Sequence, residues 1–173
     1  MPTTKNGVAA FVDRTVATLA SVAARVRNVT LGDMRLPLLA RWFVRAHAAI
    51  YSLSNGKLAT KMRGHPILVL TTRGAKTGAL RKVPIVPLVE GQNVYVIASL
   101  GGAPSHPAWF HNLKADPNVE VQWYADKYKA RARILPEPER SHVWERVVAA
   151  MPGFGDYQKK TSRVIPVVQL ERV

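Results

Sequence analysis

The basic, glycine-containing turn at residues 73–82 has the residue types that bind anions. It reads Arg-Gly-Ala-Lys-Thr-Gly-Ala-Leu-Arg-Lys and lies between two apolar runs. A glycine turn can expose backbone N–H groups, and Lys76 and Arg81 would project beside them, which suits a phosphate or a carboxylate. The turn is not a Walker A loop, because its glycines lack the Gly-Lys-Ser/Thr that must follow. A solvated basic hairpin tip is the alternative interpretation.

A second glycine loop, at residues 99–104, ends an apolar run and leads into a helix start at Pro107. Gly101 and Gly102 remove side chains where a flat ring or a pyrophosphate could lie against the backbone. A turn that needs unusual backbone angles is the ordinary alternative. The first turn of a helix at Pro107 would add unpaired N–H donors. Both loops therefore suit an anionic ligand that approaches the backbone closely.

Other chemistry has little support in the sequence. There is no cysteine, which excludes a disulfide framework, a thiolate zinc site and a catalytic thiol. His106 and His111 are five residues apart, so they do not share a helical face as an i, i+4 pair would. No Ser/His/Asp arrangement is defined by spacing. We therefore expect no metal site and no hydrolytic triad.

The positive charge of the chain is concentrated in its first half. The net charge is +14, and residues 1–82 carry fourteen Lys and Arg against two acids, whereas residues 83–173 carry eleven against nine. Such asymmetry favours an anionic partner, which could be a small molecule, an acidic lipid or a nucleic acid. We expect no nucleic acid, because the basic residues are dispersed and no recognition motif is present.

The N-terminal residues 1–30 predict an amphipathic helix. Over residues 8–27, apolar side chains recur every three or four positions: Val12, Val16, Leu19, Ala23 and Val26. The helix would pack on its own domain or lie on an anionic membrane surface. No apolar stretch approaches the roughly 18 residues of a membrane span, and Asp13 and Arg14 interrupt any secretory signal. We expect a cytoplasmic protein, with a peripheral position on the inner face of the cell membrane as the variant.

A change of hydrophobic period near residue 64 separates helical from extended structure. The pattern predicts helices at 38–53, 107–115 and 139–150, strands at 67–72, 83–90, 94–99, 119–123, 128–135 and 164–170, and a loop at 151–157. The first of these helices should bury Leu39, Trp42, Phe43, Ala46, Ile50 and Leu53, with His47 at the boundary. We expect one domain over 1–173, with a core at 38–173. Its class is α+β, a partly open and mostly antiparallel β-barrel.

Several stretches resemble one known family. They are Leu-Thr-Thr-Arg-Gly-Ala-Lys-Thr-Gly at 70–78, Gly-Gly-Ala-Pro-Ser-His-Pro-Ala-Trp-Phe-His-Asn-Leu at 101–113, Ala-Asp-Pro-Asn-Val-Glu-Val at 115–121, Pro-Gly-Phe-Gly-Asp-Tyr-Gln at 152–158 and Ile-Pro-Val-Val at 165–168. With these residues the chain resembles the deazaflavin-dependent nitroreductases, actinobacterial nitroreductases and quinone reductases that use coenzyme F420. The likeness covers about residues 40–171.

The resemblance implies a split β-barrel and a cofactor, coenzyme F420, that joins an 8-hydroxy-5-deazaflavin ring to a phosphate and an oligoglutamate tail. It implies that Lys76 and Arg81 hold the tail and phosphate. The residues implied to line the ring and its linker are Pro84, Ser99, Gly101, Gly102 and Ala103. Trp109 and Asn112 would brace the glycine loop, and Ser99 and Tyr157 would be the catalytic side chains.

The substrate implied by the resemblance is a small apolar electron acceptor: a quinone such as menaquinone, an enone or a nitro compound. Met151 and Phe154 stand where the nitroimidazole-activating relative has tyrosines, and only Tyr157 keeps a hydroxyl. We therefore expect quinone or enone reduction rather than nitro-prodrug activation. Ala75 and Leu100 also depart from the basic or polar residues common in relatives. The alternatives are a non-catalytic carrier of F420 or a tetrapyrrole, and a basic membrane or nucleic-acid adaptor.

Overall fold

The computed structural model describes the backbone of residues 38–173 and the side chains from residue 44 onward. The helix predicted within residues 1–30 lies outside the described residues. The elements, in chain order, are α2 (Leu38–Leu53), β1 (Lys61–Met62), β2 (His65–Pro66), β3 (Leu68–Arg73), β4 (Leu80–Ile85), β5 (Pro87–Glu90), β6 (Asn93–Ile97), the short 3-10 helix η2 (Leu100–Gly102), α3 (Ala108–Ala115), β7 (Asn118–Trp123), β8 (Asp126–Ile134), α4 (Glu139–Ala150), α5 (Gly153–Lys159) and β9 (Val167–Arg172).

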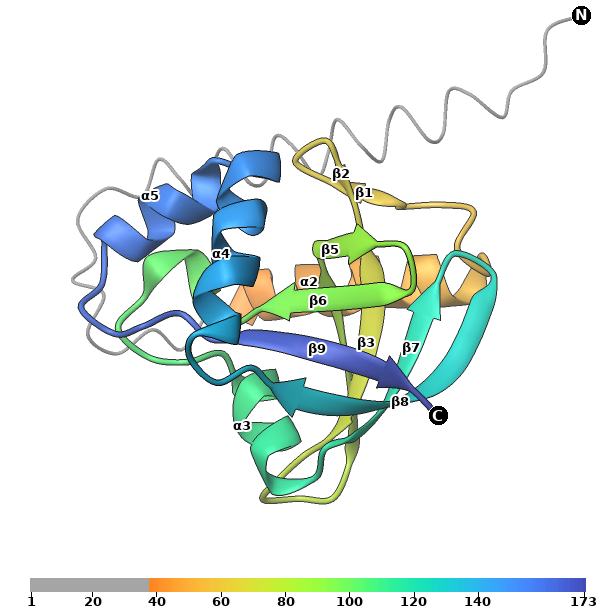
Figure 1. The fold of residues 1–173 in the computed structure, drawn as a ribbon. Helices are drawn as coiled ribbons and strands as arrows, with labels where there is room; N and C mark the ends of the chain where they lie inside the picture. Colours follow the sequence, from red (N-terminus) through yellow and green to blue (C-terminus); the bar gives the residue numbers. More distant parts are fainter. Residues whose placement is uncertain (1–37) are drawn as a thin grey trace, which may run out of the picture.

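Seven strands form one curled antiparallel sheet in the order β4-β3-β7-β8-β9-β6-β5 (Figure 1). Strands β4 and β5 are neighbours in sequence but lie at opposite edges, so the chain crosses from one edge to the other at Val86. The sequence predicted a single strand at 83–90, and the structure divides it there. Both prolines, Pro84 and Pro87, therefore lie on edge strands, where a missing N–H costs no ladder hydrogen bond. The predicted α+β, partly open antiparallel barrel is confirmed.

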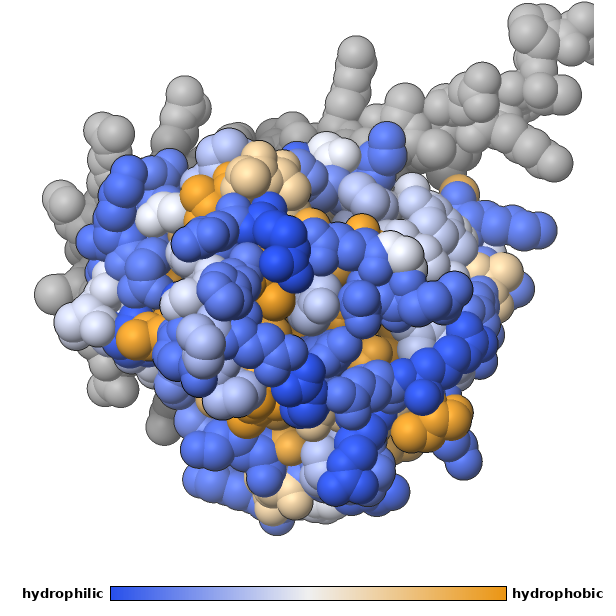
Figure 2. Space-filling view, viewed as in Figure 1, coloured by the Kyte–Doolittle hydropathy of each residue, from blue (hydrophilic) through white to orange (hydrophobic). Residues whose placement is uncertain are grey.

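The interior of the barrel is built from alternating strand positions. Leu68 and Leu70 of β3 are fully buried, and they pack with Val96, Val121 and Phe110 in one cluster. A second cluster joins β6 and β9 to helices α4 and α5. In the view of Figure 2 the surface is mostly hydrophilic, with apolar side chains scattered singly. The two clusters hold the sheet and the helices at fixed positions around the cavity described below.

Helix α2 covers the outer face of β3, but not with the side chains that the sequence predicted. Ala48 and Tyr51 are buried against Ile67 and Val69, whereas Leu53 is 87% exposed. The predicted inward face, which also included Ala46 and Ile50, is therefore wrong over its described part. The hydroxyl of Tyr51 accepts the Tyr124 N–H at 2.6 Å, which rotates this side of the helix toward the sheet.

His47 is buried rather than at the boundary, and its Nε2–H donates to the carbonyl oxygen of Ala59 at 2.8 Å. The predicted loop at 151–157 is also wrong, because α5 begins at Gly153. The Gln158 side chain fixes α5 to the following segment by donating to the Arg163 carbonyl and accepting the Ile165 N–H. The short hairpin β1–β2 was not predicted, since two-residue strands are too short to show a period.

Candidate functional site

A cavity of about 1280 Å³ lies between the barrel and its helices. Its walls come from α2, the β1–β2 hairpin, the β3–β4 turn, η2, α3 and α5. Most of the predicted site residues line it: Lys76, Arg81, Pro84, Ser99, Gly101, Trp109, Asn112, Met151, Phe154 and Tyr157. Gly102 and Ala103 do not line it. Both are buried and follow the lining residue Gly101 directly in the sequence. Residues from the two sequence loops and from the C-terminal helices thus share one cavity.

The lining of this cavity carries positive charge only. Four basic side chains contribute to it, namely Arg45, Arg63, Lys76 and Arg81, and no Asp or Glu does. Lys76 and Arg81 are exposed, so their ammonium and guanidinium groups can reach a ligand that enters from solvent. Arg81 is paired with Thr72 in the β3–β4 ladder, which fixes its backbone beside the cavity. This electrostatic environment selects for an anionic ligand.

The backbone N–H groups of the basic turn are not the anion site that the glycines suggested. The Gly74 N–H donates to the Ala79 carbonyl at 2.9 Å, the Gly78 N–H to the Gly74 carbonyl at 2.7 Å, and the Ala75 N–H to Asn112 Oδ1 at 3.1 Å. The Thr77 N–H donates to the Gly74 carbonyl, and the Ala79 N–H donates to Thr77 Oγ1. Among the backbone N–H groups of residues 74–79, only that of Lys76 has no hydrogen-bond partner within the described residues. Anion binding here must therefore depend on side chains.

Asn112 supports this turn rather than the glycine loop. Its Oδ1 accepts from Ala75, and its Nδ2 donates to Thr72 Oγ1 at 3.0 Å. One amide thereby joins α3 to both the end of β3 and the turn. The resemblance implied that Asn112 braces the glycine loop at residues 99–104, and this prediction is wrong. Trp109, its neighbour on α3, is buried in the barrel core and also lines the cavity.

The glycine loop has the unusual backbone angles that the sequence analysis gave as the ordinary alternative for it. Leu100, Gly101 and Gly102 have positive φ angles of 47°, 66° and 85°. A Cβ at Gly102 would lie 2.5 Å from the Tyr157 carbonyl oxygen, whereas one at Gly101 would meet nothing within 4 Å. The two glycines thus have different roles, because Gly102 allows α5 to approach the loop and Gly101 leaves the cavity wall open.

Arg163 is the main support of this loop, and the sequence gave no sign of it. Its Nη2 donates to the carbonyl oxygens of Ser99 at 2.7 Å and Ala98 at 3.2 Å, and its Nε donates to that of Ala103 at 2.9 Å. Its Nη1 donates to His106 Nδ1 at 3.0 Å. Desolvation lowers the pKa of Arg163, and desolvation followed by the charge of Arg163 lowers the pKa of His106. A neutral His106 can accept this bond, whereas an imidazolium cannot.

The other end of the cavity is apolar and aromatic. Met151 is buried, and the rings of Phe154 and Tyr157 meet edge to face with centroids 5.6 Å apart. The Tyr157 hydroxyl accepts a hydrogen bond from Arg63 Nη1 at 2.6 Å. This end can receive a flat apolar molecule and offers it one phenol group. Arg63 is a second site residue that sequence analysis missed.

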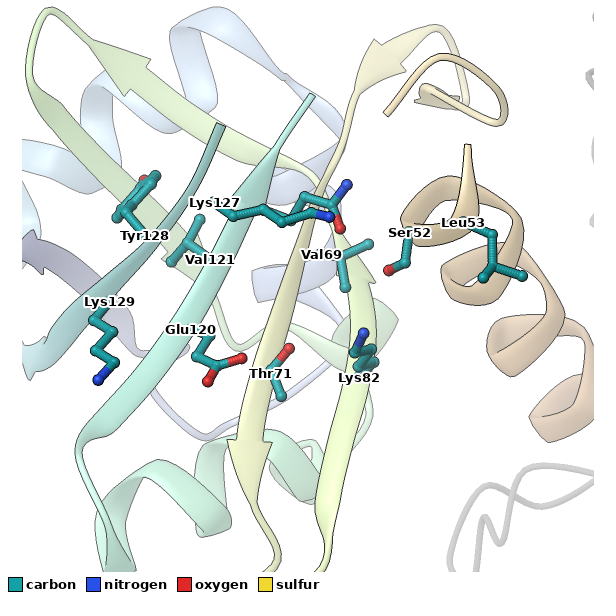
Figure 3. A pocket seen from close by; sticks show the side chains of 11 residues that line it. Ser52, Leu53, Val69, Thr71, Lys82, Glu120, Val121, Lys127, Tyr128 and Lys129 are labelled. Atoms are coloured by element: carbon teal, nitrogen blue, oxygen red, sulfur yellow. The ribbon is translucent and has the colours of Figure 1, made fainter. Parts of the chain in front are cut away.

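A smaller hollow of about 400 Å³ lies on the opposite face of β3, near the end of α2 (Figure 3). Its wall includes Thr71, Lys82, Glu120, Lys127 and Lys129. Lys82 follows Arg81 on β4 and therefore points to the other side of the sheet. The charges in this hollow are mixed, and no glycine loop borders it, so it has none of the features of the large cavity. Among the described residues no group of three or more potential ligands could hold a metal ion.

The family of the chain follows from comparison with known proteins. The profile of the F420H(2)-dependent quinone reductase family matches residues 42–172. The chain belongs to this family. It is 37% identical over 133 residues to an F420H(2)-dependent quinone reductase of Mycobacterium tuberculosis, covering 75% of this chain and 89% of that one. It is therefore an F420-dependent reductase, and coenzyme F420 is its cofactor, as the resemblance implied. Nothing in the comparisons favours a carrier or an adaptor.

Solved structures agree with this assignment and with the split-barrel fold. An F420H2-dependent reductase is 43% identical, with a TM-score of 0.57, covering 61% of this chain and 94% of that chain. A second structure, described as a domain-swapped dimer, is 37% identical with a TM-score of 0.60, covering 77% of this chain and 99% of that chain. The reductase shares with them the curled antiparallel sheet and its flanking helices.

The cavity of this F420-dependent reductase fits the cofactor by the chemistry of its lining. A phosphate and several carboxylates need cations, and the cavity supplies Lys76 and Arg81 with no competing acid. A flat ring needs a wall without side chains, which Gly101 provides beside Ser99 and Pro84. The Ser99 hydroxyl has no hydrogen-bond partner within the described residues, so it remains available to a ligand.

Proposed function

We propose that the reductase holds the phosphate and oligoglutamate tail of F420 at Lys76 and Arg81, and the ring beside Pro84, Ser99 and Gly101. Gly102 and Ala103 contribute from behind this wall, by letting the loop pack on α5 and by accepting the bond from Arg163. The observation that supports this most strongly is a single cavity without acidic side chains that is lined both by the exposed cations Lys76 and Arg81 and by the apolar and aromatic side chains of Met151, Phe154 and Tyr157.

The proposed electron acceptor is a quinone bound at the apolar end, against Met151, Phe154 and Tyr157. The reduced cofactor, when bound, supplies a hydride. The protein's own residues orient the acceptor, exclude water from the site and provide a proton from Tyr157. Ser99 and Tyr157 are the proposed catalytic groups, since both are hydroxyl-bearing side chains in the cavity wall. The family name and the apolar lining favour a quinone over a nitro compound.

Menaquinone at the membrane surface is the proposed physiological acceptor. In the described part of the chain no helix is long and apolar enough to cross a membrane. Exposed Leu53 and Ile50 on α2, the net charge of +14 and the basic first half of the chain favour contact with an anionic lipid surface. Binding to anionic vesicles should fall when residues 1–30 are deleted, and unchanged binding would exclude them as the anchor.

The experiment for the proposed function has two stages with the full-length protein. F420 is titrated while its ring fluorescence is followed, and we expect saturable binding at micromolar concentration. Reduced F420 is then oxidised in the presence of menadione, cyclohexenone or a nitroimidazole, and we expect turnover to be fastest with menadione. If F420 does not bind saturably, the proposed cofactor site is refuted. Binding without turnover of any acceptor would make the protein a carrier.

A further inference from the structure

The β1–β2 hairpin places one cation directly on the only phenol of the apolar end. Arg63 Nη1 donates to the Tyr157 hydroxyl oxygen at 2.6 Å, joining residues 94 positions apart in the sequence. Both side chains line the cavity. None of the ion pairs among the described residues involves Arg63, so no carboxylate neutralises its guanidinium. The positive charge therefore stays available to whatever binds beside Tyr157.

The direction of this hydrogen bond determines where the phenol proton can go. A guanidinium has donors and no acceptor, so the Tyr157 oxygen must accept. The Tyr157 O–H proton is left for another group, and the described part of the chain supplies no acceptor for it. A bond from a cation also polarises the phenol and strengthens its own donation. The pair is thus arranged to donate a proton to a ligand oxygen in the cavity.

The backbone that presents Arg63 is unusual. Residues 63 and 64 form the two-residue turn between Met62 and His65, with φ angles of 52° and 84°. Such turns normally place Asn, Asp or Gly at the first position, because other side chains are strained at positive φ. An arginine here is kept at an energetic cost, which is a common feature of functional positions.

Arg63 is far from the end of the cavity proposed for the anionic tail. Figure 1 shows the β3–β4 turn, which carries Lys76, at the bottom beside α3, and the β1–β2 hairpin at the top. Arg63 is instead bonded to α5, the helix that carries Phe154 and Tyr157. Its charge is therefore placed for the acceptor and not for the tail.

We propose that Arg63 is a positioning residue for the electron acceptor, holding Tyr157 so that its O–H proton points at an acceptor oxygen. This inference depends on the proposed function above. Addition of a hydride to a neutral quinone breaks the C=O π bond and leaves one negative charge on oxygen. Tyr157 gives its proton to that oxygen, forming the new O–H bond, and recovers a proton from water. Arg63 stabilises the negative charge on the phenol oxygen during the transfer.

The test compares wild type with Arg63→Met, Arg63→Lys, Tyr157→Phe and the double variant Arg63→Met/Tyr157→Phe. Lys61→Met is the matched control, because Lys61 is exposed on the same hairpin and does not line the cavity. Two probes are bound without reduced cofactor and followed by tryptophan fluorescence. One is 2-hydroxy-1,4-naphthoquinone, which is an oxyanion at neutral pH, and the other is neutral menadione. The F420 dissociation constant and the kcat and KM for menadione are measured in parallel.

We expect Arg63→Met to lower the preference for the anionic probe over menadione by about 10-fold, the scale of one charge-assisted hydrogen bond. The kcat should fall more than KM rises, and Arg63→Lys should restore part of both. The double variant should be no worse than the poorer single variant, since the two residues act as one unit. F420 affinity should stay unchanged in all of them, and Lys61→Met should behave as wild type.

An anion preference that is unchanged in both Arg63 variants would overturn the inference. Equal losses of affinity for the two probes would also overturn it, because Arg63 would then only hold the hairpin in place. If Arg63→Met does not fold, Arg63→Lys and Tyr157→Phe give the same comparison. Failure of the wild type to bind F420 or to reduce any quinone would instead refute the proposed function. The probe measurements need no cofactor, so the two failures can be told apart.

Discussion

Asn112 Oδ1 accepts the Ala75 N–H at 3.1 Å and so fixes the basic turn to helix α3. Through its Nδ2 the same side chain also holds Thr72 at the end of β3. The two elements that carry Lys76 and Trp109 are therefore positioned by a single amide. The cation that we assign to the cofactor tail depends on this contact, although Asn112 itself carries no charge.

Replacing Asn112 with Ala should weaken F420 binding without removing any charge. Two hydrogen bonds are lost, each contributing about 0.5–1.5 kcal/mol, and the Ala75 N–H loses its partner. We expect the dissociation constant to rise by about 5- to 150-fold, with a small fall in melting temperature. Asn118→Ala is a control on the surface, where Asn118 bonds only to Asp116 through its side chain. An unchanged F420 affinity in Asn112→Ala would show that the turn is held without it.

Two adjacent glycines should give separable effects. Gly102→Ala places a Cβ 2.5 Å from the Tyr157 carbonyl oxygen, so overpacking of about 1–3 kcal/mol adds to the strain of a positive φ. Gly101→Ala meets no atom within 4 Å and carries only the strain, about 1–2 kcal/mol. We expect Gly102→Ala to lower the melting temperature more than Gly101→Ala does, and Gly101→Ala to weaken F420 binding despite its smaller loss of stability. Identical behaviour of the two variants would contradict their assigned roles.

The bond between Arg163 and His106 should make stability depend on pH. The pKa of His106 is lowered, by desolvation first and then by the charges of Arg163, His111 and Lys114, so the unfolded state binds the proton more readily. The stabilisation is then complete above the ordinary histidine pKa of about 6.5 and is lost as the pH falls through the lower folded value. Urea unfolding between pH 7.5 and pH 5 measures this loss.

His106→Gln should flatten that dependence, because the side chain no longer titrates, while His142→Gln on the exposed face of α4 should leave it as in wild type. Arg163→Met should lower stability at every pH, since the carbonyl groups of Ala98, Ser99 and Ala103 lose their donors. If the pH dependence persists in His106→Gln, another group causes it.

The sequence predicted the sheet well because its strands are apolar runs bounded by turn residues. Helix α2 shows the limit of such patterns. Its largest apolar side chains defined one face, yet the structure buries Ala48 and Tyr51, since a small residue and a tyrosine hydroxyl that can reach Tyr124 fit the sheet better. Periodicity counts apolar positions but does not include a hydrogen bond to a residue 73 positions away.

The same limit explains which site residues could be predicted. Lys76, Gly101 and Phe154 belong to local motifs, so they could be found from sequence. Arg63 and Arg163 act across long separations on a phenol and on three carbonyl groups, and nothing in their neighbouring residues signals this. The backbone N–H groups of the basic turn were misjudged for a related reason, because their partners include Asn112, 37 positions away.

The role of Lys76 and Arg81 as the cation pair for the F420 tail is the centre of this account, and a fluorescence titration of F420 tests it most directly. Lys76→Ala and Arg81→Ala should each raise the dissociation constant by about 10- to 100-fold, since a charge-assisted hydrogen bond contributes about 1.5–3 kcal/mol. The salt dependence of binding should decrease in both variants. Lys82→Ala is the control, because its side chain lies in the hollow on the other face of β3 (Figure 3). Wild-type affinity in Lys76→Ala and Arg81→Ala, or an equal loss in Lys82→Ala, would contradict the account.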